Sequence, residues 1–139
     1  MFSLTKNLKI FAALFFFYTI IFRYFLSYSI TNQMPILKWI VAIIYGIIIF
    51  FTAFMLGKSE VVNTGVIYLG FKYHLISYLI FNIFGIAWNV LELSSKYEDF
   101  SHALLIMGIW GIFLLIHLLL SLLLSKNAIK GIPQDDIFE

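Results

Sequence analysis

Two polar residues at four-residue spacing, with a third beside them, interrupt an otherwise apolar stretch, FKYHLISYLIFN, at residues 71–82. They are His74, Tyr78 and Asn82, and Asn89 follows one heptad after Asn82. Positions three or four apart lie on the same side of an α-helix, so His74 and Tyr78 share a face and Asn82 lies beside it. Imidazole, phenol and carboxamide groups can hydrogen-bond between helices, ligate a metal or haem, or exchange protons.

A second row of this kind lies in WGIFLLIH, residues 110–117, and it contains Trp110 and His117. The turn between the two rows centres near residue 97, which lies 23 residues after His74 and 20 residues before His117. At about 1.5 Å per helical residue, these lengths differ by roughly one turn or less. The spacing therefore predicts two imidazoles at nearly the same depth in an antiparallel helix pair, with Tyr78 within reach of His117.

Three interpretations fit this candidate polar cluster. The groups form interhelical hydrogen bonds that set helix register, or the imidazoles titrate and report or relay protons. In the third interpretation, His74 and His117 ligate a metal or bind haem axially, although two histidines supply only half of the ligands of a structural zinc site. The cluster comprises His74, Tyr78, Asn82, Asn89, Trp110 and His117.

No motif of catalysis accompanies these residues. The chain has no cysteine, and the apolar stretches hold no paired carboxylates, zinc-protease motif or phosphate-binding loop. Its acidic residues, among them Glu60, Glu92 and Glu98, lie at the ends of the apolar stretches or outside them. We therefore expect no enzymatic activity. The net charge of +2 comes from scattered basic residues, which predicts no nucleic-acid partner.

The composition places these residues in a lipid bilayer. Of the 139 residues, 63% are hydrophobic and 12% are charged, whereas soluble domains are about half apolar and about a quarter charged. Four stretches are long enough to cross about 30 Å of hydrocarbon as helices, at residues 10–30, 36–56, 71–91 and 103–124. The first apolar run exceeds the usual length of a signal peptide core and is expected to be retained.

The predicted fold is therefore an all-α membrane protein of four transmembrane helices arranged as two antiparallel hairpins. The expected divisions are an N-terminal hairpin at 1–57, an interfacial connector at 58–70, a second hairpin at 71–125 and a cytoplasmic tail at 126–139.

Basic residues near the ends of the spans predict the orientation. The side of the termini would hold Lys6, Lys9, Lys58, Lys72, Lys126 and Lys130, and the other side Lys38, Lys96 and Arg23. This asymmetry predicts a multi-pass protein of the cell membrane with both termini in the cytoplasm. Arg23 is interpreted as an anchor that reaches the interface or an anionic lipid headgroup, and Lys38 and Trp39 as an interfacial pair.

The second hairpin resembles the 2TM domain, a small bacterial membrane module, over about residues 69–120. The resemblance is carried by GFKYHLISYLIFN, by Asn89 and by IWGIFLLIH, in which Ile109 and Phe113 replace family glycines. It implies a membrane part of small or signalling proteins. We therefore expect a sensing or scaffolding module that acts through a membrane-protein partner or as a homo-oligomer. The alternatives are a bis-histidine haem or metal protein in electron transfer and, less favoured, a small channel or transporter.

Overall fold

The computed structural model describes residues 5–64 and 69–130, which form four long α-helices. They are α1 (Lys6–Thr31), α2 (Pro35–Thr64), α3 (Leu69–Val90) and α4 (Phe100–Lys130). Each is long and apolar enough to cross a membrane. The shortest, α3, has 22 residues, which gives a length of about 33 Å at the α-helical rise. The all-α, four-span prediction is confirmed.

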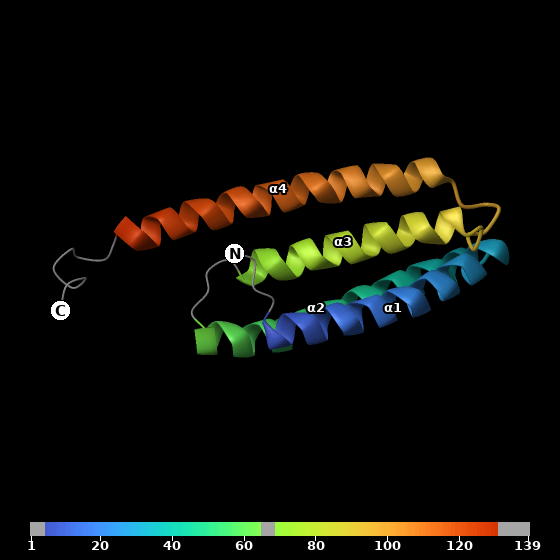
Figure 1. Cartoon of the computed structure of the whole chain (residues 1–139). Helices are drawn as coiled ribbons and strands as arrows, with labels where there is room; N and C mark the ends of the chain where they lie inside the picture. The colour runs from blue at the N-terminus through green and yellow to red at the C-terminus, as the bar shows by residue number, and fades with distance from the viewer. Residues whose placement is uncertain (1–4, 65–68, 131–139) are drawn as a thin grey trace.

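The helices run side by side along a common direction (Figure 1). The α1–α2 turn and the α3–α4 loop lie at one end of the molecule, and the first residues of α1 and the last residues of α4 lie at the other. Within the described residues, α1, α2 and α3 pack against one another, whereas α4 packs against α3 alone. The fold is thus a three-helix bundle with a fourth helix attached to one of its members.

The apolar core lies among the first three helices. Leu8, Phe11 and Phe15 recur at helical spacing on one face of α1 and meet Leu69 and Tyr73 of α3. The rings of Phe11 and Tyr73 lie 4.8 Å apart between centroids, a separation typical of favourable aromatic pairs. Half-buried side chains of α2 pack against this cluster. The core therefore joins the two predicted hairpins into one body.

Two helices extend beyond the ends predicted for them. α2 continues through Gly57 to Thr64, and α4 continues to Lys130. A single glycine costs a helix about 1 kcal/mol but does not end it, and no proline follows until Pro133. The expected connector at 58–70 and the expected tail at 126–139 therefore both begin with helical residues. Residues 65–68 and 131–139 of these two segments lie outside the described part of the chain.

The loop between α3 and α4 holds the ends of both helices in fixed positions. After Val90 the chain turns through Glu92, whose φ of 57° lies in the left-handed region. Asp99 then caps α4, because its carboxylate accepts hydrogen bonds from the Ser101 amide at 2.9 Å and the Ser101 hydroxyl at 2.7 Å. These bonds hold the pKa of Asp99 below its usual range. The cap fixes the start of α4 and with it the position of Glu98.

Candidate functional site

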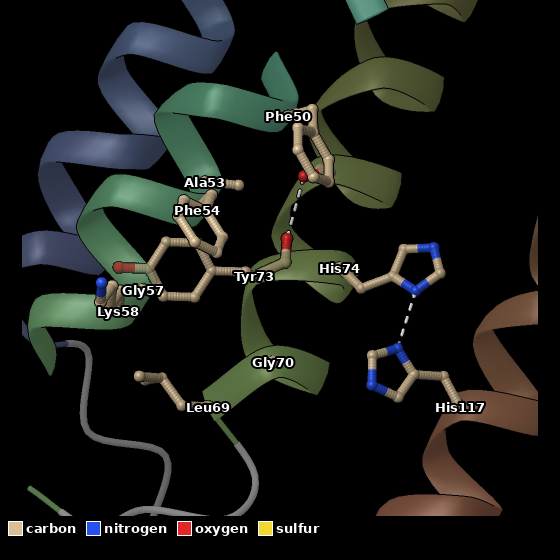
Figure 2. Close-up of a pocket in the computed structure, with 11 residues that line it drawn as sticks. Phe50, Ala53, Phe54, Gly57, Lys58, Leu69, Gly70, Tyr73, His74 and His117 are labelled. Carbon is tan, nitrogen blue, oxygen red and sulfur yellow. Dashed lines mark hydrogen bonds between the residues drawn. The ribbon is translucent and has the colours of Figure 1, made fainter. Parts of the chain in front are cut away.

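Three side chains form a chain of hydrogen bonds between α3 and α4. The indole Nε1–H of Trp110 donates to Nε2 of His74 at 2.6 Å. Nδ1 of His74 lies 3.1 Å from Nδ1 of His117, and Figure 2 shows the two imidazoles facing each other across the gap between the helices. The two histidines lie at one depth, as their spacing from the loop predicts. We call Trp110, His74 and His117 the histidine chain.

The Trp110 donor at one end of the histidine chain determines which ring nitrogens of His74 and His117 carry protons. An indole N–H can only donate, so Nε2 of His74 must be the bare nitrogen of a neutral imidazole. The proton of His74 is therefore on Nδ1, from which it is donated to Nδ1 of His117. His117 in turn carries its proton on Nε2. The two histidines are thus neutral and in opposite tautomers, and the chain ends in an N–H group of His117.

The other polar residues of α3 make different contacts. Tyr78 reaches α4, where its hydroxyl donates to the Met107 carbonyl at 3.4 Å, rather than to His117. The Tyr78 oxygen also lies 3.2 Å from where a Cβ on Gly111 would be, so the glycine makes room for it. Asn82 and Asn89 donate to carbonyls of their own helix, those of Tyr78 and Gly85, at 2.7 and 3.0 Å. These two amides therefore stabilise α3 and do not bridge to α4 through their N–H groups.

The spacing of the imidazoles differs from that of an axial haem pair. Ligand nitrogens at about 2.0–2.1 Å on opposite sides of a metal are separated by about 4 Å, whereas the facing nitrogens here are 3.1 Å apart and share a proton. Nε2 of His74 is occupied by the Trp110 donor. In the described residues, no group of three or more His, Asp or Glu side chains has the arrangement of a metal site. The geometry favours the hydrogen-bonding interpretation of the pair.

All members of the histidine chain lie on α3 and α4. Residues 68–129 match the family model of the 2TM domain. The match confirms the predicted resemblance of this segment to the 2TM domain, and we call residues 68–129 the 2TM segment. It contains the whole histidine chain together with Tyr78, Asn82 and Asn89, whereas α1 and α2 lie outside it. No curated protein and no solved structure matches this chain.

A second polar cluster joins α1 to the loop of the 2TM segment. Nη2 of Arg23 lies 3.2 Å from Oε2 of Glu98, and both side chains are only 10% exposed. The hydroxyl of Ser27 donates to Oε1 of Glu98 at 2.6 Å and accepts from the Trp88 indole at 3.3 Å. The Ser95 amide also donates to Oε1 of Glu98, at 3.2 Å. We call Arg23, Ser27, Trp88, Ser95 and Glu98 the arginine cluster.

The sequence did not reveal the partner of Arg23. The sequence predicted that Arg23 anchors the first span at the lipid interface, and this role stays a prediction. In the structure, the guanidinium is buried against Glu98. Glu98 was missed because it lies between two spans, 75 positions along the chain. The sequence offered one clue to this partner. An arginine within a membrane span is energetically costly, so it requires an acidic partner near the same depth.

The predicted interfacial pair lies at the α1–α2 end of the molecule. The Lys38 ammonium lies 5.6 Å from the centre of the Trp39 ring, within the range of a cation–π contact. Trp39 is 65% exposed, near the start of α2. This geometry is compatible with the predicted role, which stays a prediction.

Proposed function

We propose that this small membrane protein is a non-enzymatic sensing or scaffolding module, and that α4 is the helix through which it recognises partners in the bilayer. The observation that carries the proposal is the attachment of α4. It packs against α3 alone among the described helices, and the histidine chain fixes its position there. A helix held in one register on one side presents a defined surface on the others.

The free surface of α4 is apolar and has the chemistry of a membrane interface. Ile109, Phe113 and Ile116 are each about half exposed, and they recur at helical spacing on one side of α4. Lipid tails are as apolar as these side chains, so association between membrane helices depends on packing and on defined shape. A rigidly registered α4 supplies that shape to a second copy of the chain or to another membrane protein.

Site-directed cross-linking in native membranes tests this proposal, and the chain is suited to it because it has no cysteine. Ile109→Cys and Ile116→Cys place a thiol on the free side of α4, and Ile47→Cys is the control on α2, at 52% exposure. We expect cross-linked products from the two α4 positions and few from Ile47→Cys. Equal yields at all three positions, or none on α4, would contradict a partner-binding role for this helix.

We also propose that the protein lies in the cell membrane with both termini in the cytoplasm. The start of α1 and the end of α4 share one end of the molecule, and the excess of lysines near that end supports a cytoplasmic side. Cysteines at Ser3 and Leu93 would lie on opposite sides of the membrane. An impermeant thiol reagent added to intact cells should label Leu93→Cys and spare Ser3→Cys, and the reverse pattern would invert the topology.

A further inference from the structure

A cavity of about 160 Å³ lies between α1, α3 and α4. Among the described helices α4 packs against α3 alone, which leaves space between α4 and α1. Most of the cavity wall is apolar and includes the rings of Phe22, Phe81 and Phe100. An apolar cavity of about 150 Å³ is large enough to bind benzene. The cavity can therefore hold a small organic molecule.

Two polar residues, Arg23 and Asn82, interrupt this apolar wall. Arg23 lies eight residues before the end of α1, and Asn82 lies eight residues before the end of α3. Both helices end on the same side of the molecule, at the α1–α2 turn and the α3–α4 loop (Figure 1). The two residues therefore lie at a similar depth, about 12 Å from these helix ends. Within a membrane, polar side chains at such a depth require partners.

Arg23 has hydrogen-bond donors that the protein does not use. Its bond to Glu98 is made by Nη2. Nε is buried without an acceptor among the described residues. Nη1 donates to none of those residues either, but it is not buried in this way. The guanidinium can thus donate a further hydrogen bond, while its charge is already balanced by Glu98.

Asn82 supplies a complementary acceptor. Its Nδ2–H group donates to the Tyr78 carbonyl at 2.7 Å, and no described residue donates to its Oδ1. A hydroxyl group both accepts and donates, so it can satisfy Arg23 and Asn82 together. A carbonyl or an ether only accepts and would leave Oδ1 unpaired. A carboxylate or a phosphate would bring a second negative charge near Glu98 in a nonpolar environment, which is costly.

We propose that this cavity binds a small lipid-soluble molecule with an apolar body and one hydroxyl group. The hydroxyl oxygen would accept a hydrogen bond from Nη1 of Arg23, and the hydroxyl hydrogen would be donated to Oδ1 of Asn82. Water offers the same groups, but one molecule takes only about 30 Å³, and apolar cavity space stays dry. The inference goes beyond partner binding through α4 and does not depend on it.

Two probes of similar shape, phenol and benzene, test the hydroxyl contact. They differ by one hydroxyl group, and each is titrated into the full-length protein in detergent micelles. The methyl group of Met107, which lines the cavity, reports binding by NMR. The methyl group of Met55, which is 70% exposed on α2, reports partition of the probe into the micelle. Binding is a saturable shift at Met107 that Met55 does not share.

Three variants locate the contact. Asn82→Leu keeps the size of the side chain and removes the acceptor. Gly85→Leu fills the cavity, because Gly85 lines it and a Cβ there meets nothing within 4 Å. Gly46→Leu is the matched control, because a Cβ at Gly46 also meets nothing within 4 Å and residue 46 lies outside the cavity. Arg23 is left unchanged because it belongs to a buried ion pair.

We expect both probes to bind the wild type and Gly46→Leu, and neither to bind Gly85→Leu. In Asn82→Leu the ratio of phenol to benzene affinity should fall about tenfold, the effect of losing one well-placed hydrogen bond. Partition into the micelle cancels in this comparison because it is the same for each protein. An unchanged ratio would overturn the hydroxyl contact, and saturable binding to Gly85→Leu would overturn the location. No saturable shift in the wild type would show that water or lipid tails fill the cavity and would overturn the proposal.

A second measurement needs no variant. In the wild type, saturating phenol should move the carboxamide carbon signal of Asn82 downfield, because Oδ1 gains a donor. Benzene is the control and should leave this signal in place. Equal shifts with the two probes, or no shift with phenol, would contradict the proposed contact with Asn82.

Discussion

Two polar clusters attach α4 and its loop to the rest of the protein, and they do so by opposite chemistry. The histidine chain is neutral, half-buried and confined to the 2TM segment. The arginine cluster is charged, the side chains of its ion pair are almost wholly buried, and it ties the loop of the 2TM segment to α1. Each includes an indole donor, Trp110 in one and Trp88 in the other.

This difference in charge determines what each cluster can contribute to the protein. A buried ion pair requires both partners, since removing one leaves an uncompensated charge. A chain of neutral hydrogen bonds contributes less, but its direction fixes proton positions and leaves a free donor at the end. We therefore assign the arginine cluster to holding the fold together and the histidine chain to setting the register of α4 and presenting the His117 N–H.

The largest effect is expected from Glu98→Ala. This change leaves Arg23 buried without its partner and should destabilise the protein by about 3–5 kcal/mol. Denaturant unfolding in detergent micelles measures it. The matched control is the double change Arg23→Met with Glu98→Gln, which removes both charges and should recover most of the loss. A single variant as stable as the wild type would show that the ion pair contributes nothing.

Acidification should affect the two clusters differently. Both imidazoles must be neutral for the histidine chain to form, because a charged imidazole has two donors and no acceptor. The contribution of the chain is therefore present while both rings are neutral, and it is lost on acidification once either ring gains a proton. Lys58, which lines a groove together with the two histidines, and Tyr78, whose ring packs against Trp110, bring no negative charge to offset the added proton.

Spin labels on α3 and α4 measure this effect as a longer interhelical distance at low pH. Labels on α1 and α2 are the control, since the core between those helices contains no imidazole. Parallel changes in both pairs of labels would contradict a local opening at the histidine chain.

A moderate effect is expected from Trp110→Phe. The ring stays apolar, but His74 loses the donor that fixes its tautomer. Interhelical hydrogen bonds in membranes contribute about 0.6 kcal/mol on average and up to about 2 kcal/mol, and the 2.6 Å distance suggests the upper part of that range. Trp88→Phe, which removes a 3.3 Å bond to Ser27, should cost less. The reverse ranking in unfolding experiments would place the stronger donor in the arginine cluster.

The smallest effect concerns two glycines of α4. Gly108→Ala meets open space and should stabilise the helix by about 0.5–1 kcal/mol. Gly111→Ala brings a methyl group to 3.2 Å from the Tyr78 oxygen, so the tyrosine must move by a few tenths of an ångström and part of the gain is lost. Thermal melts of the two variants compare them directly, and equal stabilisation would show that Tyr78 moves without cost.

The two clusters also differ in how far the sequence predicted them. His74 and His117 lie one on each of two predicted spans, so their similar depth followed from counting residues to the loop between the spans. Glu98 lies in that loop, where no periodicity applies, and its side chain direction depends on the turn through Glu92 and the cap at Asp99. The number of spans followed from hydropathy, whereas the packing of α1 against α3 depends on side-chain shapes that hydropathy does not describe.

The direction of the histidine chain is the central claim, and nitrogen-15 NMR of the histidines in lipid bilayers tests it most directly. One-bond couplings and chemical shifts distinguish protonated from bare ring nitrogens. At neutral to mildly alkaline pH, the structure predicts a proton on Nδ1 of His74 and a proton on Nε2 of His117, with the other nitrogen bare in each ring. The same tautomer in both residues, or a proton on Nε2 of His74, would contradict it.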